Sequence, residues 1–212
     1  MIERTKLLLD GEWTLADLDY LGRSLNISYA YLYWMTVPED HIPTHIRGAF
    51  ARDLWSREYV NETFPHFLLS RIPYEQQARI VSIKYSSPGW IEMAAAVSTL
   101  SALAMCVRAW LTTTDRAIET LQKIIQFLRQ CGRIGRSGKI SLDEKTAVAI
   151  SDAEKLYKEV APVLGFSPKD ATRILELTGN PISALRLMAA IAKSSDRLAE
   201  LQRAGKLKIP KA

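Results

Sequence analysis

Histidine and acidic side chains, which could bind a metal ion or transfer protons, gather in one short segment of this chain. His41 and His45 lie in the segment 38–45 together with Glu39. Two histidines four residues apart can bind one metal ion when they lie on the same face of a helix. Pro43 stands between them and prevents a regular helix, so we expect neither a metal ion nor a cofactor.

Nucleophilic catalysis has no recognisable motif either. No serine stands at the centre of a Gly-x-Ser-x-Gly sequence, which marks the nucleophile of many hydrolases. Cys106 lies in an apolar stretch, where a thiol is a poor nucleophile. Cys131 is the other cysteine, and the two lack the spacing of a disulfide framework. We therefore expect free thiols, a reducing cytoplasmic location and no enzymatic activity.

A basic, glycine-rich segment separates two stretches of helical pattern at residues 129–139. Its cations are Arg129, Arg133, Arg136 and Lys139. The segment does not fit a phosphate-binding Walker A loop, because Gly132 lies one position too far from Gly138 and Lys139 is followed by isoleucine. We expect a mobile linker, with nucleic-acid binding through the four cations as the alternative.

Part of this segment is similar to a known nucleic-acid-binding loop. Residues 134–140 read I-G-R-S-G-K-I and resemble the I-G-x-x-G loop of KH domains. In those domains the loop joins two helices and clamps single-stranded nucleic acid through its backbone. KH domains continue into strands, whereas residues 142–164 have the pattern of one long helix, so the resemblance is confined to the loop.

The charge of the chain is unevenly distributed. With 48% hydrophobic and 24% charged residues, the composition is that of a globular protein. Residues 1–112 hold ten Lys and Arg against twelve Asp and Glu, a net charge of −2, and residues 113–212 hold eighteen against eleven, a net of +7, which together give +5. A basic half favours an anionic partner, such as nucleic acid or lipid headgroups, or consists of solvated helix faces.

A long uncharged run of the sequence, Met93–Val107, lies between Glu92 and Arg108. Its fifteen residues fall between the roughly 20 that cross a bilayer and the roughly 10–14 of a buried helix. Serine and proline at positions 87 and 88 are typical of a helix start. We expect a continuous helix over residues 88–112, joined to a second helix in an antiparallel apolar hairpin, 88–131.

This hairpin is the candidate contact for oligomerisation or for a membrane. Trp90 and Trp110 stand at the two ends of the apolar helix, as interfacial anchors do. The alanine, serine and threonine residues between them suit close helix packing better than insertion into lipid. We therefore expect Leu100 and Leu103 to be buried by protein, and a homo-oligomer, most simply a dimer, to form at or near the hairpin.

The apolar spacing predicts a mainly α protein, a helical bundle with one or two short β-strands in its N-terminal half. Alternation at 79–85 predicts a strand, and the segment 6–9 is a second candidate. Thr14 is a candidate N-cap for the first long helix, and later helices should follow Ser167 and Pro181. The expected organisation is an N-terminal helical domain (1–131), a linker (132–140), a C-terminal helical domain (141–204) and a tail (205–212).

The C-terminal part is similar to a second family. Residues 164–167 read L-G-F-S and residues 177–181 read L-T-G-N-P, which resembles the loops of three-helix ubiquitin-associated (UBA) domains. The resemblance implies that Gly165, Phe166 and Leu187 contact a small folded protein partner. The alternative is a plain helical hairpin that turns at Gly179 and the residues after it.

The segment 81–88, V-S-I-K-Y-S-S-P before an apolar stretch, resembles a loosely defined group of uncharacterised bacterial proteins. The resemblance covers residues 13–130 and implies a bacterial origin. We expect a non-enzymatic protein–protein interaction or assembly module. The alternatives are a membrane-associating effector, for example of a bacterial antiviral defence system, that uses residues 90–111, and a nucleic-acid binder that uses residues 129–139.

Overall fold

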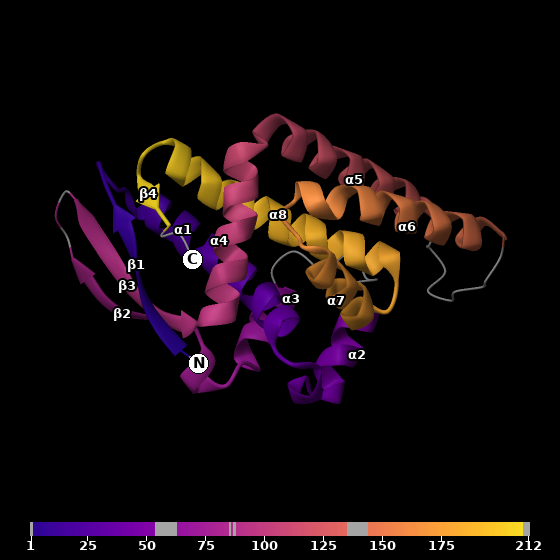
Figure 1. The fold of residues 1–212 in the computed structure, drawn as a ribbon, viewed down its shortest axis with the longest axis horizontal. Helices are drawn as coiled ribbons and strands as arrows, with labels where there is room; N and C mark the ends of the chain where they lie inside the picture. Colours follow the sequence, from indigo (N-terminus) through magenta and orange to yellow (C-terminus); the bar gives the residue numbers. More distant parts are fainter. Residues whose placement is uncertain (1, 54–62, 85, 87, 135–143, 210–212) are drawn as a thin grey trace.

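The computed structural model describes residues 2–53, 63–84, 86, 88–134 and 144–209, and within them it shows a mainly α protein with a small antiparallel sheet (Figure 1). The helices are α1 (Leu15–Thr36), α2 (Thr44–Asp53), α3 (Thr63–Ser70), α4 (Val97–Thr112), α5 (Thr114–Ile134), α6 (Glu144–Val163), α7 (Pro168–Thr178) and α8 (Pro181–Arg203). The strands are β1 (Ile2–Leu9), β2 (Arg79–Lys84), β3 (Gly89–Ala96) and β4 (Leu207–Lys208). The predicted fold class is confirmed, and so is the predicted strand that became β2.

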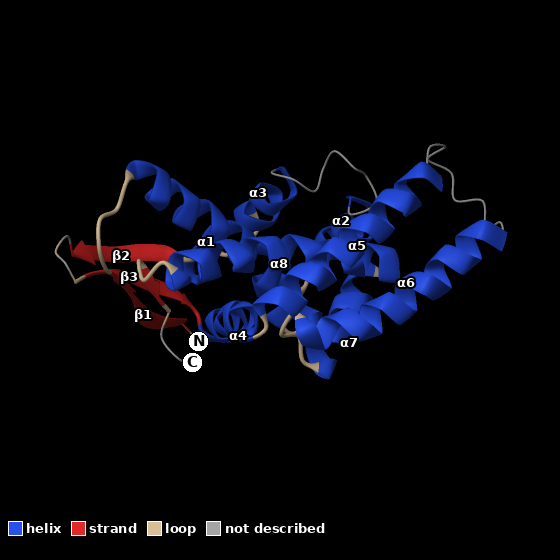
Figure 2. Ribbon diagram, turned by 90° about the horizontal axis from the view of Figure 1, so that it is seen from above, coloured by secondary structure: helices blue, strands red, loops and turns tan. Residues whose placement is uncertain are grey.

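The four strands form one sheet in the order β2-β3-β1-β4, with every neighbouring pair antiparallel. Leu7 lies opposite Ile91, and Ile91 lies opposite Ile83, so these three side chains share one face. This inner face is turned toward the helices, and we call the opposite one the outer face. The sheet stands at one end of the molecule, and the helices extend away from it (Figures 1 and 2).

The apolar segment does not form one helix. Residues 89–96 are strand β3, and the helix α4 begins only at Val97, so the prediction of a continuous helix over 88–112 is wrong. β3 lies between β2 and β1, and Ala94, Ala95 and Ala96 at its end are buried on both faces of the sheet, so this strand lacks the alternation of polar and apolar residues that marks a half-exposed strand. A Cβ on Gly89 would lie 2.6 Å from the carbonyl oxygens of Lys84 and Ser86, so the close approach of these groups requires a glycine at the start of β3.

Local sequence signals explain where several helices begin and end. Thr14 and Asp17 form a capping box at the start of α1, which confirms the predicted N-cap. Ser167 and Asp170 form another at the start of α7. Gly179 ends α7 at φ 72°, a left-handed conformation that favours glycine. The sequence spacing of Ser141 and Glu144 also predicts a capping box before α6, and Ser141 lies outside the described residues.

Helix α8 lies at the centre of the helical part and packs against α1, α4, α5, α6 and α7 (Figure 1). Its apolar side chains Leu185, Met188 and Ile191 are fully buried. The buried side chains form one continuous cluster that extends from Leu7 to Leu207. Residues of both predicted helical domains therefore contribute to the same core.

The C-terminal segment is attached to the start of the chain. The sequence predicted a tail at 205–212, but β4 pairs with β1 within this segment and Leu207 is fully buried. Lys206 Nζ lies 2.8 Å from Asp17 Oδ2. This ion pair, together with hydrogen bonds from Thr14, lowers the pKa of Asp17 to about 2. The C-terminal segment is thus attached to the N-terminal part of the chain by strand pairing and by this ion pair.

Candidate binding surfaces of the sheet

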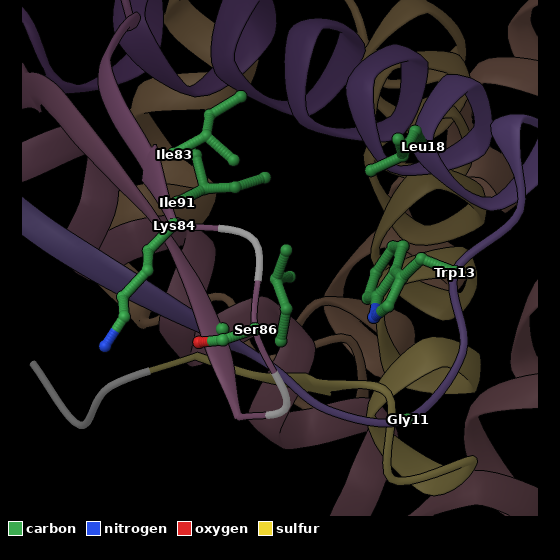
Figure 3. A pocket seen from close by; sticks show the side chains of 9 residues that line it. Gly11, Trp13, Leu18, Ile83, Lys84, Ser86 and Ile91 are labelled. Carbon is green, nitrogen blue, oxygen red and sulfur yellow. The ribbon is translucent and has the colours of Figure 1, made fainter.

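An apolar cleft of about 300 Å³ opens between the inner face of the sheet and the start of α1. Leu9, Ile83 and Ile91 line it from the sheet, and Trp13 and Leu18 line it from the α1 side (Figure 3). This volume lies at the lower end of the range of ligand pockets, and it suits one or two large apolar side chains.

The wall of the cleft on the α1 side is fixed by local structure. Trp13 Nε1 donates a hydrogen bond of 3.1 Å to the carbonyl of Asp10, which holds the indole across the intervening turn. Gly11 makes this turn at φ 70°. Leu18 follows the capping box by one residue and is held by the first turns of α1. The cleft is therefore preformed by the backbone that precedes and begins α1.

The cleft continues onto an unpaired strand edge. β2 is an edge strand of the sheet, and among the described residues it pairs only with β3. Ile80 lies opposite Met93 and Ile83 lies opposite Ile91, so both β2 side chains point to the inner face. Ile80 is nevertheless 60% exposed and Ile83 is 49% exposed. Adjacent exposed apolar side chains on a structured surface are typical of an interaction site.

Positive charge surrounds this edge but does not enter the cleft. Lys84 and Ser86 also line the cleft, yet their side chains point away from Trp13 and Leu18 (Figure 3). Arg79, at the other end of β2, stacks its guanidinium 4.9 Å from the ring centre of Tyr74. β2 contains no acidic residue. The edge is therefore apolar on the inner side and cationic on the outer side.

The outer face of the sheet is strongly basic. The register places five cations on it, from β1, β2 and β4: Arg4, Lys6, Arg79, Lys84 and Lys208. Glu92 is the acidic residue of this face, and it lies 3.9 Å from Arg4 and accepts a hydrogen bond from Ser82. Trp90 is half-buried between β1 and β2, with Lys6 Nζ 4.5 Å from its ring centre. Cations and an aromatic ring thus share one exposed surface.

Comparisons with known proteins found no relative of this chain. No family matches the chain, and neither a curated protein nor a solved structure matches it. The functional assignment therefore rests on the surfaces of the molecule itself.

The structure also describes the histidine, acidic and cysteine side chains that the sequence analysis considered for metal binding or catalysis. Among the described residues, no group of three or more His, Cys, Asp and Glu side chains could hold a metal ion. The Cys106 thiol is buried, and this burial raises its pKa to about 12, so it carries almost no thiolate at neutral pH. His41 and His45 are exposed on the segment that leads into α2 and at its start.

The predicted basic site is only partly described. Arg129 is exposed on the last turns of α5. Arg133 belongs to α5, but its side chain lies outside the description, as do Arg136 and Lys139 altogether. The expectation of a mobile linker and the resemblance to a KH loop fall on the same residues and stay predictions.

The residues taken from the UBA resemblance face the interior. Gly165 packs against α4, where a Cβ would lie 2.8 Å from Ala109 Cβ. Phe166 is 5% exposed and Leu187 is fully buried. These side chains therefore contact the chain's own helices and are not available to a partner in this conformation.

The residues predicted to contact a membrane or a second subunit are separated by the fold. Leu103 and Trp110 on α4 are buried by the chain itself, and Leu100 is partly buried. Trp90 lies on β3 instead of on the same helix. Within the described ranges, no helix combines the length and apolar character needed to cross a bilayer. The expectation that Leu103 is buried by protein is confirmed.

The two surfaces of the sheet were missed by the sequence analysis. Both depend on residues that are far apart in the chain, because the sheet joins residues 2–9, 79–84, 89–96 and 207–208. One local signal was available: Arg4 and Lys6 alternate with Thr5 and Leu7, which is the pattern of a strand with one cationic face.

Proposed function

We propose that this protein is a non-enzymatic interaction module that accepts an extended segment of another protein along β2. The observation that carries the proposal is the pair Ile80 and Ile83, exposed side by side on an unpaired strand edge that opens into an apolar cleft. Main-chain hydrogen bonds to a free edge supply affinity in this binding mode, and pockets for alternate side chains supply specificity.

The form of the edge supports a selective partner. Proteins commonly protect an edge strand with a charged side chain that points inward, or with a bulge. The register of β2 shifts between Ile80 and Ser82, so a bulge is present, but the inward-pointing side chains are apolar. The bulge limits which strands can pair with β2. Contact with Ile80 and Ile83 still stabilises a strand that brings apolar side chains to the inner face.

The charges on β2 disfavour a second copy of this chain as the partner. In an antiparallel pair of two β2 strands, the register that matches Ile80 with Ile83 also sets Arg79 opposite Lys84 at both ends. Like charges directly opposite one another are destabilising. A partner segment with apolar residues toward the cleft and acidic residues on the other side avoids this repulsion. The expected homo-oligomer is therefore the less favoured use of this edge.

The test uses a fluorescent, end-blocked peptide of about eight residues, a typical strand length, with leucine alternating with aspartate. We expect saturable binding in fluorescence anisotropy. Ile83→Lys should weaken it about tenfold or more, because it places a charge where an apolar contact is buried. Ile118→Lys is the matched control, since Ile118 is an exposed isoleucine on α5, away from the sheet, and this variant should bind normally.

Three outcomes would contradict the proposal. The first is that the peptide does not bind, or that a scrambled peptide of the same composition binds equally well. The second is that both isoleucine variants lose binding to the same extent. The third is a dimer in light scattering that Ile83→Lys converts to a monomer, since that result would assign the edge to self-association.

A further inference from the structure

Most of the outer face of the sheet, on the side opposite the cleft, has no role in the proposed peptide binding, which involves only its edge cations Arg79 and Lys84. Its cations come from β1, β2 and β4, and a single carboxylate, Glu92, opposes them among the described residues. The side chain of Arg4 remains 70% exposed although it lies near Glu92. A concentration of positive charge on one surface attracts an anionic polymer and accelerates its association.

Aromatic rings accompany these charges at two places. Trp90 is the second residue of the central strand β3 and lies directly opposite Leu8 on β1 and Lys84 on β2. Tyr74 lies beside the first residue of β2, is 67% exposed and already stacks against Arg79. A ring next to a cation is the arrangement with which proteins stack a base and neutralise its phosphate.

We propose that this face binds single-stranded nucleic acid, with Trp90 as a stacking platform and the surrounding cations as phosphate contacts. Some four-stranded sheets bind single strands in this way, with unstacked bases lying flat against aromatic side chains of the strands. Duplex DNA fits poorly, because its major groove admits a helix or a two-stranded ribbon but not the face of a wider sheet.

Lys6 must move for a base to reach Trp90, because its ammonium group now lies over the indole ring. Lys6 is exposed on β1, so this movement requires only a change of its side-chain rotamer. An exposed cation–π contact is weak, whereas a base stacked on an aromatic ring contributes more. The released ammonium group then lies close to the phosphate of the same nucleotide.

The face is better suited to a nucleic acid than to a membrane. Apolar side chains on it, such as Leu8, lie among the strands and alternate with cations. Peripheral membrane proteins instead insert an apolar helix face or loop below the headgroups. An anionic vesicle is nevertheless a necessary comparison, because its charge alone would attract the same cations.

The experiment measures binding of the full-length chain to a labelled oligothymidylate of about 12 nucleotides, which is within the range covered by one small domain. The slope of log affinity against log salt should be about −3, since each phosphate contact on a single strand contributes roughly −0.7. The double variant Lys6→Gln/Lys208→Gln should weaken binding about tenfold at low salt and reduce the slope by about 1.4. Lys169→Gln, an exposed lysine on α7, is the control and should change neither.

The variant Trp90→Leu distinguishes the contribution of base stacking to binding from the contribution of charge. We expect it to weaken binding about tenfold while the salt slope stays the same, because it removes a ring and no cation. Circular dichroism verifies that the variant is folded, and the lysine variants test the proposal independently if it is not.

The proposal is overturned by any of three results. Oligothymidylate that does not bind at low salt excludes the site. Binding that is equal in the wild type and the Lys6/Lys208 double variant places the contact elsewhere, for example at the basic segment 129–139. Tighter binding of duplex DNA or of phosphatidylserine vesicles, with the same dependence on these lysines, assigns the face to a different polyanion.

Discussion

Gly165 shows how one residue can serve two structural requirements at once. Its φ of +85° is a conformation that residues with a side chain rarely adopt. A Cβ at this position would also lie 2.8 Å from Ala109 Cβ and 3.1 Å from the carbonyl oxygen of Met105. The loop between α6 and α7 can therefore approach α4 closely only because residue 165 has no side chain, and this approach helps to bury Phe166.

We predict that Gly165→Ala lowers the free energy of unfolding by about 3 kcal/mol, from strain at positive φ together with the clash against α4. Gly179→Ala is the matched control, because Gly179 also has a positive φ, +72°, but a Cβ there would meet nothing within 4 Å. It should cost only about 1 kcal/mol. Urea unfolding of both variants measures the difference, and equal losses would show that the contact with α4 is unimportant.

The sequence could identify Gly165 and Phe166 as special, but it could not tell what they contact. A glycine and an aromatic residue between two helices indicate a turn with an apolar side chain beside it. In an isolated three-helix domain that side chain would be exposed and free to bind a partner. Here α4 covers it, and α4 is distant in the chain. The contact with α4 could not be predicted, because long-range packing is not encoded in the local pattern.

At the scale of elements, α1 and α8 form the central helix pair of the molecule. Tyr20 on α1 donates a hydrogen bond of 2.6 Å to Glu200 on α8, which identifies the side of α1 that faces α8. Ser24 and Ser28 follow on this side, one and two turns later, and both are fully buried. Their hydroxyl groups have no hydrogen-bond partner among the described residues. Small size, and not hydrogen bonding, is therefore the property that these positions require.

Two substitutions of Ser28 separate these properties. Ser28→Ala keeps the small volume and removes a buried hydroxyl without a partner, so we expect a neutral effect or a stabilisation of up to about 1 kcal/mol. Ser28→Leu forces the helices apart and should destabilise the protein by about 1–3 kcal/mol. Thermal and urea unfolding measure both. A large loss in Ser28→Ala would instead indicate that the hydroxyl makes a hydrogen bond, for example to a buried water molecule.

The elements differ in how well the sequence predicted them. Helices with caps and amphipathic spacing, such as α1 and α7, were predicted at their correct starts. β3 was not, because Ile91, Met93 and Ala95 belong to a run of apolar residues that fits a buried helix as well as a central strand. The basic outer face was missed for a related reason: the register that gathers its cations exists only once the strands pair.

At the scale of the whole molecule, the sheet joins the two ends of the chain. β4 pairs with the last two residues of β1, where Leu9 lies opposite Leu207 and also lines the cleft. The N–H of Asp10 donates a hydrogen bond of 3.0 Å to the carbonyl of Lys206. The C-terminal segment therefore supports the strand that lines the proposed binding cleft with Leu9. The sequence analysis predicted a tail here, because two strand residues are too few for a periodic pattern.

The contribution of this attachment can be tested at two adjacent residues of β4. Leu207 is fully buried, so Leu207→Ala should leave a cavity and lower the free energy of unfolding by about 2–4 kcal/mol. Lys208 is exposed, and Lys208→Ala should change it by less than about 0.5 kcal/mol. Urea unfolding compares the two, and an unchanged stability in Leu207→Ala would show that the segment is a loose tail in solution. Because Leu207 lies directly opposite Leu9 on the neighbouring strand, we expect Leu207→Ala also to weaken peptide binding to the cleft. Oligonucleotide binding to the opposite face should persist as long as the sheet is folded.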